Sequence, residues 1–317
     1  MIDKFEKPLK DSLAECADRE FLFVKPGGNY GDDLIYKGLE KLARVLNLRG
    51  QTVTAQEFVA APAPGDKVIY IHGCGGLNPW GRGTVMRIFE HAIQREGGTV
   101  ILGPQTIETG QGYAGSEFFS KLANYRAASV TMYVREKTSL NLLIGNIPKE
   151  YKLHLDHDTA FHLTPADLLD GEPVSQRYDL LGLREDPEQP EQAISVNPSA
   201  GVRLDPAYFA MSFKHWIRLH AQARRIITNR THSSIAGAIL GKPTTLLPGV
   251  YHKNRSIWEY SMQDKNVKWM ESADLNRAFP TTHSGAVWWE GLPLAQKIAG
   301  SWKVQRSIKY LRGVPLN

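Results

Sequence analysis

The chain has 317 residues, enough for two domains with separate hydrophobic cores, since domains typically span about 100 to 200 residues. Its 42% hydrophobic and 22% charged residues exclude a collagen, a filament and a disordered protein. The net charge of +5 is modest and spread over many segments, so it does not indicate a nucleic-acid partner, whereas small anions suit it.

Two cysteines, Cys16 and Cys74, are too few for a disulfide framework or a four-ligand zinc site, and this usage is typical of a reducing cytoplasm. The N-terminal residues MIDKFEKPLKDSLAE lack the apolar region of a signal peptide. No stretch approaches the ~20 apolar residues of a membrane span. We therefore expect a cytoplasmic protein.

The first half of the chain alternates short apolar runs with amphipathic helical patterns. We expect strands at residues 21–24, 67–71, 99–103 and 129–134, and helices at residues 8–18, 32–47, 84–96 and 116–124. Gly50 is expected to stop the second helix. Apolar strands of this length, separated by helices, indicate a parallel sheet covered on both faces. The pattern predicts a doubly wound α/β domain.

A polar, turn-rich segment at residues 164–177 separates this half from a second one of the same kind. Its expected strands are residues 178–183, 225–229 and 244–249, and its expected helices are residues 231–240 and 255–263. We predict an N-terminal α/β domain at 1–170 and a C-terminal α/β domain at 171–317. Two Rossmann-like domains facing a cleft would make the fold GT-B-like, with ligands at the carboxyl ends of the strands.

The last predicted helix, residues 294–312, carries basic residues and no acid. Two interpretations stay open: a basic amphipathic helix that contacts anionic lipid, and a closing helix that packs on the domains with a solvated basic face.

The stretch KPGGNYGDD follows the first strand and opens the next helix. Gly28 and Gly31 let the backbone turn tightly around Asn29. Asp32 lies where the helix begins, so it is either an N-cap or a general base kept ionised by the helix dipole. Because a carboxylate repels phosphate, we expect Asp32 to meet a neutral hydroxyl.

A second constellation, ITNRTHSS, runs from a strand into a small-residue helix. Arg230 offers planar, permanently charged donors suited to carboxylate or phosphate. His232 lies at a helix N-terminus, where the dipole disfavours the imidazolium until an anion binds. The alternative is a polar helix start with Ser233 as the cap, but the neighbouring arginine favours the functional interpretation.

Two further cationic positions follow strands. Lys253 and Arg255 come after TTLLPG, and either an anion site or a solvated basic turn would account for them. Arg135 follows the strand at 129–134, where it is either a second anion clamp or the surface partner of Glu136.

Two motifs carry weaker signals. The loop HGCGGLNPWGRG, with Gly73, Gly75 and Gly76, shapes a pocket but matches neither a Walker lysine pattern nor a clean GxGxxG. Within it, Cys74 is either a small residue in a crowded turn or a reactive thiol. The segment HLDHDTAFHL gathers histidines and aspartates, but strand geometry would point them to both faces, so we expect no metal.

Taken together, these pieces resemble the polysaccharide pyruvyltransferase family. The matching motifs are NYGD (29–32), GCGGL (73–77), LGPQ (102–105), REKTS (135–139), DTAF (158–161), RTH (230–232) followed by AGAILGKP, and YHK (251–253). They cover roughly residues 21–260. Thr231 departs from the leucine that the family often has there, and the spacing from Tyr251 to Lys253 is shorter than usual, so Arg255 is kept as an alternative to Lys253.

The resemblance implies an enzyme that transfers pyruvate from phosphoenolpyruvate to two hydroxyls of a sugar in a bacterial exopolysaccharide or cell-surface glycan, as a ketal. In the family the acceptor is often still lipid-linked. From the positions of Asp32 and of the cations, we expect the first domain to bind the acceptor and the second to hold most of the donor's anionic groups. Asp32, Arg135, His232 and Lys253 look like the family's functional positions, accompanied by Arg230.

The residues fit this chemistry independently. Phosphoenolpyruvate carries a carboxylate and a phosphate, for which Arg135, Arg230 and Lys253 are candidate ligands. We hypothesise that His232 is the acid and Asp32 the base, with no cofactor besides the donor itself. The rival predictions are a GT-B glycosyltransferase that uses a nucleotide sugar and a non-catalytic partner in a glycan-assembly complex.

Overall fold

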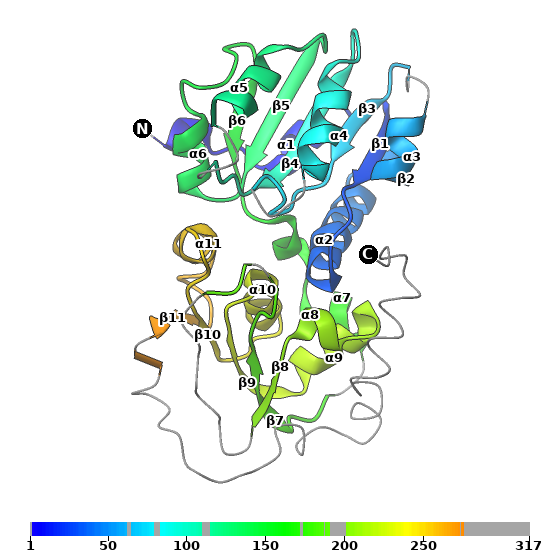
Figure 1. The fold of residues 1–317 in the computed structure, drawn as a ribbon. Coiled ribbons are helices and arrows are strands. Elements are labelled where there is room, and N and C mark those ends of the chain that lie inside the picture. Colours follow the sequence, from blue (N-terminus) through cyan, green and yellow to red (C-terminus); the bar gives the residue numbers. More distant parts are fainter. Residues whose placement is uncertain are drawn as a thin grey trace, which may run out of the picture. The chain divides into compact units, whose positions relative to one another are not determined.

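The computed structural model describes residues 2–61, 65–78, 83–109, 115–171, 174–186, 188–190, 201–272 and 274–275 (Figure 1). These residues form two compact units. Among these described residues, the first unit holds those up to Gly28, within Asp32–Leu163 and Glu259–Ser261, and the second holds Asn29–Gly31 and those within Thr164–Trp258 and from Met262 to Leu275. The main crossing therefore lies between Leu163 and Thr164, a few residues before the boundary predicted at 170.

The first unit is a parallel six-stranded sheet in the order β2-β1-β3-β4-β5-β6. Its strands are β1 (Glu20–Lys25), β2 (Arg49–Thr54), β3 (Val68–Ile71), β4 (Thr99–Gln105), β5 (Ser129–Val134) and β6 (Lys152–Leu155). Its helices are η1 (Asp3–Phe5), α1 (Leu9–Ala14), α2 (Tyr30–Val45), α3 (Ala55–Ala60), α4 (Thr84–Ile93), α5 (Gly115–Ala123), α6 (Lys137–Leu143) and η2 (Thr159–His162).

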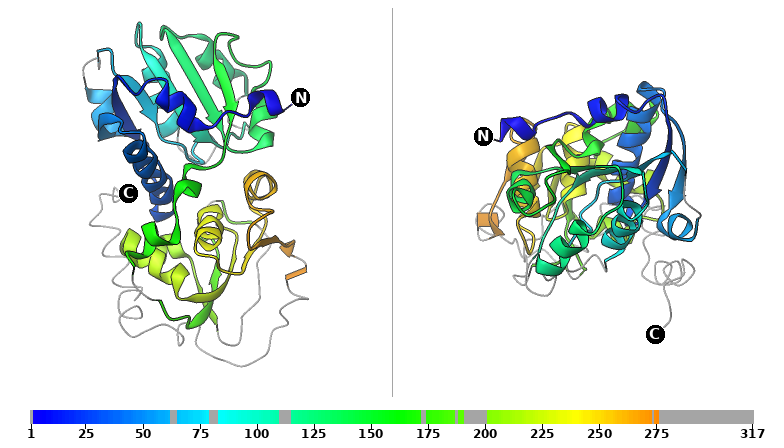
Figure 2. Two further views of the ribbon diagram at one scale, coloured as in Figure 1. Left: turned by 180° about the vertical axis from the view of Figure 1, so that it is seen from behind. Right: turned by 90° about the horizontal axis from the view of Figure 1, so that it is seen from above.

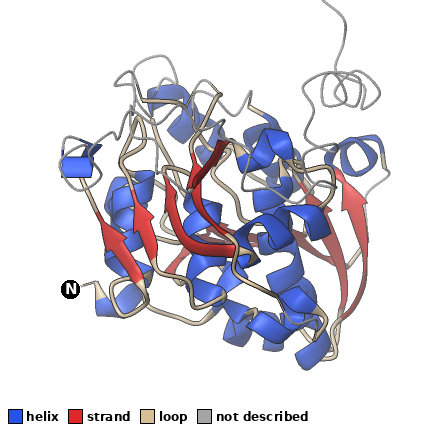
Figure 3. Ribbon diagram, turned by 90° about the horizontal axis from the view of Figure 1, so that it is seen from below, coloured by secondary structure: helices blue, strands red, loops and turns tan. Residues whose placement is uncertain are grey.

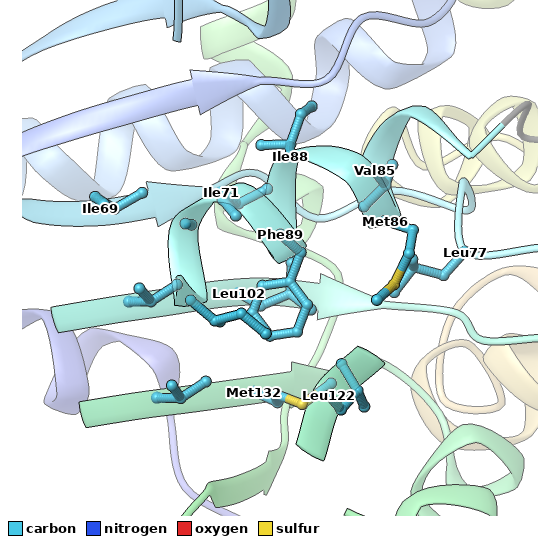
Figure 4. Packing of buried hydrophobic residues seen from close by; sticks show 14 of the residues in the cluster. Ile69, Ile71, Leu77, Val85, Met86, Ile88, Phe89, Leu102, Leu122 and Met132 are labelled. Carbon is cyan, nitrogen blue, oxygen red and sulfur yellow. The ribbon is translucent and has the colours of Figure 1, made fainter. Parts of the chain in front are cut away.

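Helices cover both faces of this sheet, as the continuous apolar strands predicted. On one face, α1 and α2 pack Leu13 and Leu39 against Phe23 and Tyr70 of the strands, and α1 crosses the strands opposite α4 and α5 (Figures 1 and 2). On the other face, Phe89 of α4 lies against Leu102 of β4 (Figure 4). The first half is thus a doubly wound α/β unit.

The end of α2 corrects one expectation. The helix stops at Val45, and Asn47 rather than Gly50 adopts the left-handed conformation, with φ 52°. The amide of Leu48 donates to the Ala43 carbonyl at 2.9 Å, the bond that closes a Schellman turn. Gly50 lies in β2 instead, where a Cβ would meet the Phe21 carbonyl oxygen at 2.2 Å. Its role is to let two strands approach closely.

The second unit is a parallel five-stranded sheet in the order β11-β10-β9-β7-β8, with helices flanking the strands (Figure 3). Its strands are β7 (Tyr178–Gly182), β8 (Gly201–Leu204), β9 (Ala223–Thr228), β10 (Thr244–Leu246) and β11 (Val267–Trp269). Its helices are α7 (Pro165–Leu169), α8 (Pro206–Phe209), α9 (Phe213–Ala221), α10 (Thr231–Ile239) and α11 (Lys253–Ser261). The predicted α/β fold with two Rossmann-like sheets is therefore confirmed.

The two sheets share a topology. In each, the first strand of the unit lies between the second and the third: β1 between β2 and β3, and β7 between β8 and β9. The chain reverses its winding direction at β1/β3 and at β7/β9, and such switch points are where open α/β sheets bind ligands. The loops after these four strands are therefore the places to look for a site.

Within the described ranges, no helix has both the length and the apolar character needed to cross a membrane. The predicted closing helix at 294–312 lies outside the described residues.

Candidate functional site

The carboxyl ends of β7, β9 and β10 are tied together by two buried asparagines. Asn229, after β9, accepts a hydrogen bond from the backbone amide of Arg184, after β7, at 2.8 Å. Asn254 of α11 donates to the Asn229 carbonyl at 2.8 Å and to the Leu247 carbonyl at 3.0 Å. These bonds hold the three loops at the β7/β9 switch point in one fixed arrangement.

Six charged side chains gather at this point, and we call them the charged cluster. They are Arg184, Asp186, Glu188, Asp205, Arg230 and Lys253. All lie in the second unit, and none is more than 17% exposed as a side chain. Three cations thus face three carboxylates in a largely dehydrated place.

Arg230 is the most buried cation of the cluster. Its Nε and Nη2 each lie 2.5 Å from an oxygen of Asp205, a bidentate pair, and Nη2 also reaches Asp186 at 2.8 Å. Burial works against its charge, but the two carboxylates outweigh it and raise the pKa of Arg230 further. Asp205 is only 2% exposed, so this pair fixes the guanidinium at the end of β9.

Arg184 and Lys253 converge on a single carboxylate oxygen. Arg184 Nη1 lies 2.7 Å from Glu188 Oε2, and Lys253 Nζ lies 2.6 Å from the same atom. Arg184 also holds Asp186 with a fork, Nε at 2.9 Å and Nη2 at 3.1 Å. Arg184 is therefore the central cation, because it contacts both carboxylates of its own loop.

The carboxylates of this loop are ionised at neutral pH. Burial raises the pKa of Asp186, but hydrogen bonds and charge from Arg184 and Arg230 prevail and lower it to about 2. Burial likewise opposes ionisation of Glu188, and the charges of Lys253 and Arg184 outweigh it, so that the pKa of Glu188 is lowered too.

His232 occupies the first turn of α10. The helix begins at Thr231, whose hydroxyl donates to Asn254 Oδ1 at 2.6 Å, and Arg230 is the N-cap residue. Ser233 is therefore not the cap, contrary to the alternative considered from the sequence. A Cβ on Gly31 would lie 2.8 Å from His232 Cβ and 3.0 Å from Nδ1, so this glycine leaves room for the imidazole.

Asp32 is not the N-cap of its helix. α2 begins at Tyr30, and Asn29 supplies the cap by accepting the Gly31 amide at 2.8 Å. Asp32 lies in the first helical turn, and its carboxylate folds back over Gly28, where a Cβ would meet Oδ2 at 2.2 Å. Gly28 has φ 139°, a conformation that glycine adopts readily. The glycine turn therefore makes space for the carboxylate.

Arg135 follows β5 as predicted but lies inside the first unit. It is 1% exposed, with Nη1 2.5 Å from Asp158 and Nε 2.9 Å from the Thr106 hydroxyl. The alternative of a surface pair with Glu136 is wrong, because Glu136 is buried and caps α6 through the Ser139 amide. The structure shows Arg135 in an ion pair with Asp158, and its predicted role in donor binding stays a prediction.

The glycines of the GCGG loop make room for neighbouring chain. A Cβ on Gly73 would meet the Pro104 carbonyl oxygen at 2.3 Å, and one on Gly76 would meet Val85 at 2.6 Å. The Gly75 carbonyl accepts a bond from Asn78. Cys74 is buried, and its sulfur accepts the Gly76 amide at 3.1 Å, which fits a residue in a crowded turn.

The segment HLDHDTAFHL distributes its side chains among different partners. Asp156 accepts the Leu9 amide at 2.6 Å, His157 bonds to Ser261 at 2.9 Å, and Asp158 pairs with Arg135. Across the described part of the chain, no group of three or more His, Cys, Asp or Glu residues has a geometry that would hold a metal ion.

The structure also separates Lys253 from Arg255. Arg255 stacks on Trp269, 5.1 Å from the ring centre, and pairs loosely with Glu271 at 3.7 Å, both side chains being about half exposed. Of the predicted cations, the structure brings together Arg230 and Lys253.

Sequence reasoning missed Arg184 and the three carboxylates. A signal for Arg184 existed, because it stands directly after a predicted strand, as Arg230 does. The carboxylates had none, since Asp205 and Asp186 meet Arg230 only when β8 and β9 flank β7.

The chain has two Rossmann-like units, and polar or charged side chains follow the strands at the switch point of each. This is the architecture of a GT-B-like α/β protein. Residues 29–248 match the family described as Polysaccharide pyruvyl transferase, well over half of the chain, so the protein belongs to this family of transferases. The resemblance inferred from the motifs is confirmed. Asp32, Arg135, Arg184, Arg230 and His232 lie within the matched range.

A comparison with solved structures supports the fold and says nothing further about function. A solved structure of a functionally uncharacterised protein from Klebsiella pneumoniae subsp. pneumoniae superposes with a TM-score of 0.59 at 17% identity, over 82% of this chain and 96% of that one. Comparison with curated proteins gives no match.

Proposed function

We propose that this transferase moves pyruvate from phosphoenolpyruvate to two hydroxyls of one sugar residue in a bacterial exopolysaccharide or cell-surface glycan precursor, forming a ketal. The charged cluster carries the proposal. It offers Arg230 and Lys253 in fixed positions at a switch point, where the donor's phosphate and carboxylate need several cations. Both cysteines are free, which suits the cytoplasmic location that we expect.

Catalysis is assigned to His232 as acid and Asp32 as base. C3 of the donor accepts a proton and becomes a methyl group while the first hydroxyl oxygen bonds to C2. The C2–O bond to phosphate then breaks, and the second hydroxyl oxygen takes its place and closes the ketal. Of the two hydroxyl protons, one balances the new methyl and the other leaves with phosphate, so no redox cofactor is needed.

Each of the two residues has a glycine that leaves it room. The imidazole of His232 lies against Gly31, and the carboxylate of Asp32 lies over Gly28. The adjacent Asp33 has its pKa raised by burial and by the charge of Asp32.

The test is phosphate release from phosphoenolpyruvate with a panel of galactosides, glucosides, mannosides and N-acetylmannosaminides. We expect acceptor-dependent release that falls at least ~100-fold in His232→Ala and in Asp32→Asn, the scale of general acid–base catalysis. Asp33→Asn is the matched control and should retain most activity. If no acceptor in the panel elicits phosphate release, and a nucleotide sugar stabilises the protein thermally while phosphoenolpyruvate does not, the protein is a glycosyltransferase instead.

A further inference from the structure

Glu188 stands where an anionic ligand would bind. Its Oε2 receives Arg184 Nη1 at 2.7 Å and Lys253 Nζ at 2.6 Å, two cations converging on one oxygen. A phosphate oxygen held by an arginine and a lysine would have the same surroundings. The site is therefore occupied by a carboxylate of the protein itself.

The two carboxylates of the loop differ in how firmly they are held. Asp186 accepts the Arg184 fork, the Arg230 Nη2 and the backbone amide of Glu188, at 2.8–3.1 Å. Glu188 is held through Oε2 by Arg184 and Lys253. Glu188 is thus the carboxylate that an incoming anion displaces at lower cost, while Asp186 and Asp205 keep both arginines in place.

We propose that Arg184 is a further donor-binding residue and that Glu188 is an internal competitor, which occupies the phosphate position between Arg184 and Lys253 until the donor displaces it. The identity of the donor rests on the proposed function, whereas the competition concerns any phosphate-bearing anion. When the donor binds, the Glu188 carboxylate returns to water, and the two cations exchange one anion for another.

This arrangement solves a problem of charge. Three cations packed together without anions would repel one another in a place of low dielectric. With Glu188, Asp186 and Asp205 in place, the cluster is neutral before the donor arrives. The consequence is a weaker apparent affinity, because the donor binds only the fraction of molecules in which Glu188 has left.

The test measures binding of inorganic phosphate and of phosphoenolpyruvate by isothermal titration calorimetry. Glu188→Gln keeps the size of the side chain and removes its charge, so we expect both ligands to bind about tenfold more tightly. Glu185→Gln, which removes a charge from an exposed position of the same loop, should leave both affinities unchanged. Arg184→Lys, which keeps the charge and loses the fork, should weaken binding about tenfold.

A stability measurement supplies a second readout. Without phosphate, Glu188→Gln takes the paired carboxylate from Lys253 and leaves Arg184 with Asp186 alone, so its melting temperature should fall below that of the wild type. Saturating phosphate should then raise the melting temperature of the variant by more than that of the wild type. Unchanged or weaker phosphate binding by Glu188→Gln would overturn the proposal.

The two proposals fail separately. If wild-type protein releases phosphate from phosphoenolpyruvate but Glu188→Gln binds no more tightly, the competitor is refuted and the transferase assignment stands. If phosphoenolpyruvate is neither bound nor turned over, yet Glu188→Gln tightens inorganic phosphate binding, the anion site stands and the donor assignment falls.

Discussion

His72, just beyond β3, is a buried histidine surrounded by aromatic rings. Tyr36, Tyr70 and Phe23 lie 4.8 to 6.5 Å from it between ring centres, and neither of its nitrogens finds a hydrogen-bond partner in the described part of the chain. Burial, aided by the charge of Lys25, lowers its pKa to about 3. The folded protein therefore holds His72 neutral across the physiological range.

Replacing His72 by Phe should change how stability depends on pH. Between the unfolded pKa of about 6.5 and the folded value, His72 is protonated in the unfolded chain and neutral in the folded chain. Each unit of acidification in that window removes about 1.4 kcal/mol of the free energy of unfolding. The variant should lose this slope, as measured by urea denaturation at pH 7 and pH 5. Tyr70→Phe is the control and should keep it; equal slopes in wild type and His72→Phe would refute the assignment.

The Arg135–Asp158 pair predicts a large effect of a single substitution. Both side chains are 1% exposed, so Arg135→Gln leaves a buried carboxylate without its cation. We expect a loss of about 3–5 kcal/mol in the free energy of unfolding, measured by urea denaturation. Lys7→Gln breaks a more exposed pair with Glu15 and should cost less than about 1 kcal/mol. A cost that small for Arg135→Gln would instead favour its predicted role in donor binding.

At the scale of elements, α2 carries two glycines with different neighbours. A Cβ on Gly38 would lie 1.9 Å from the Thr159 carbonyl oxygen, a backbone atom that η2 holds in place. A Cβ on Gly31 would press on side chains, those of His232 and Asn29. The first glycine serves packing, and the second leaves space for an imidazole.

Alanine at Gly38 should therefore affect stability, and alanine at Gly31 should affect turnover. Gly38→Ala should lower the free energy of unfolding by about 3 kcal/mol, the scale of overpacking against backbone. Gly31→Ala should change stability little, because alanine favours a helix by about 1 kcal/mol, while displacement of His232 reduces turnover at least ~10-fold. Urea denaturation and the phosphate-release assay separate the two. Full turnover in Gly31→Ala would argue against His232 as the acid.

Elements were predictable where burial leaves a pattern in the sequence. β3 and β5 are apolar almost throughout and were found from that signal. β2, RGQTVT, is an exposed edge strand with no apolar run, so its Gly50 was mistaken for a helix stop. Position after a strand pointed to Arg230 and Lys253, which the structure brings into one cluster, whereas the role of His232 stays a prediction. The ion pairs of these two cations depend on strand order, which local patterns do not contain.

At the scale of the whole molecule, the two units repeat one topology but differ in charge at their switch points. The β7/β9 point holds the charged cluster, whereas the β1/β3 point holds the glycine-rich stretch with Asp32. This division supports the assignment of the donor to the second unit.

Hydrogen exchange read by mass spectrometry should show that division directly. Saturating inorganic phosphate should slow exchange around residues 183–186, 228–232 and 251–255, where backbone amides adjoin the cluster. Peptides around Arg135 should be unaffected. Protection near Arg135 in place of the second-unit segments would move the anion site to the first unit.

The cations and two of the carboxylates of the charged cluster come from different parts of the chain. Arg184 follows β7, Arg230 follows β9, and Lys253 begins α11, whereas Asp186 and Glu188 share the loop of Arg184. If Glu188 competes with the donor as proposed, a substitution of this one residue changes the affinity while every cation stays. Position 188 is therefore a place where anion affinity can be changed while Arg184, Arg230 and Lys253 all stay.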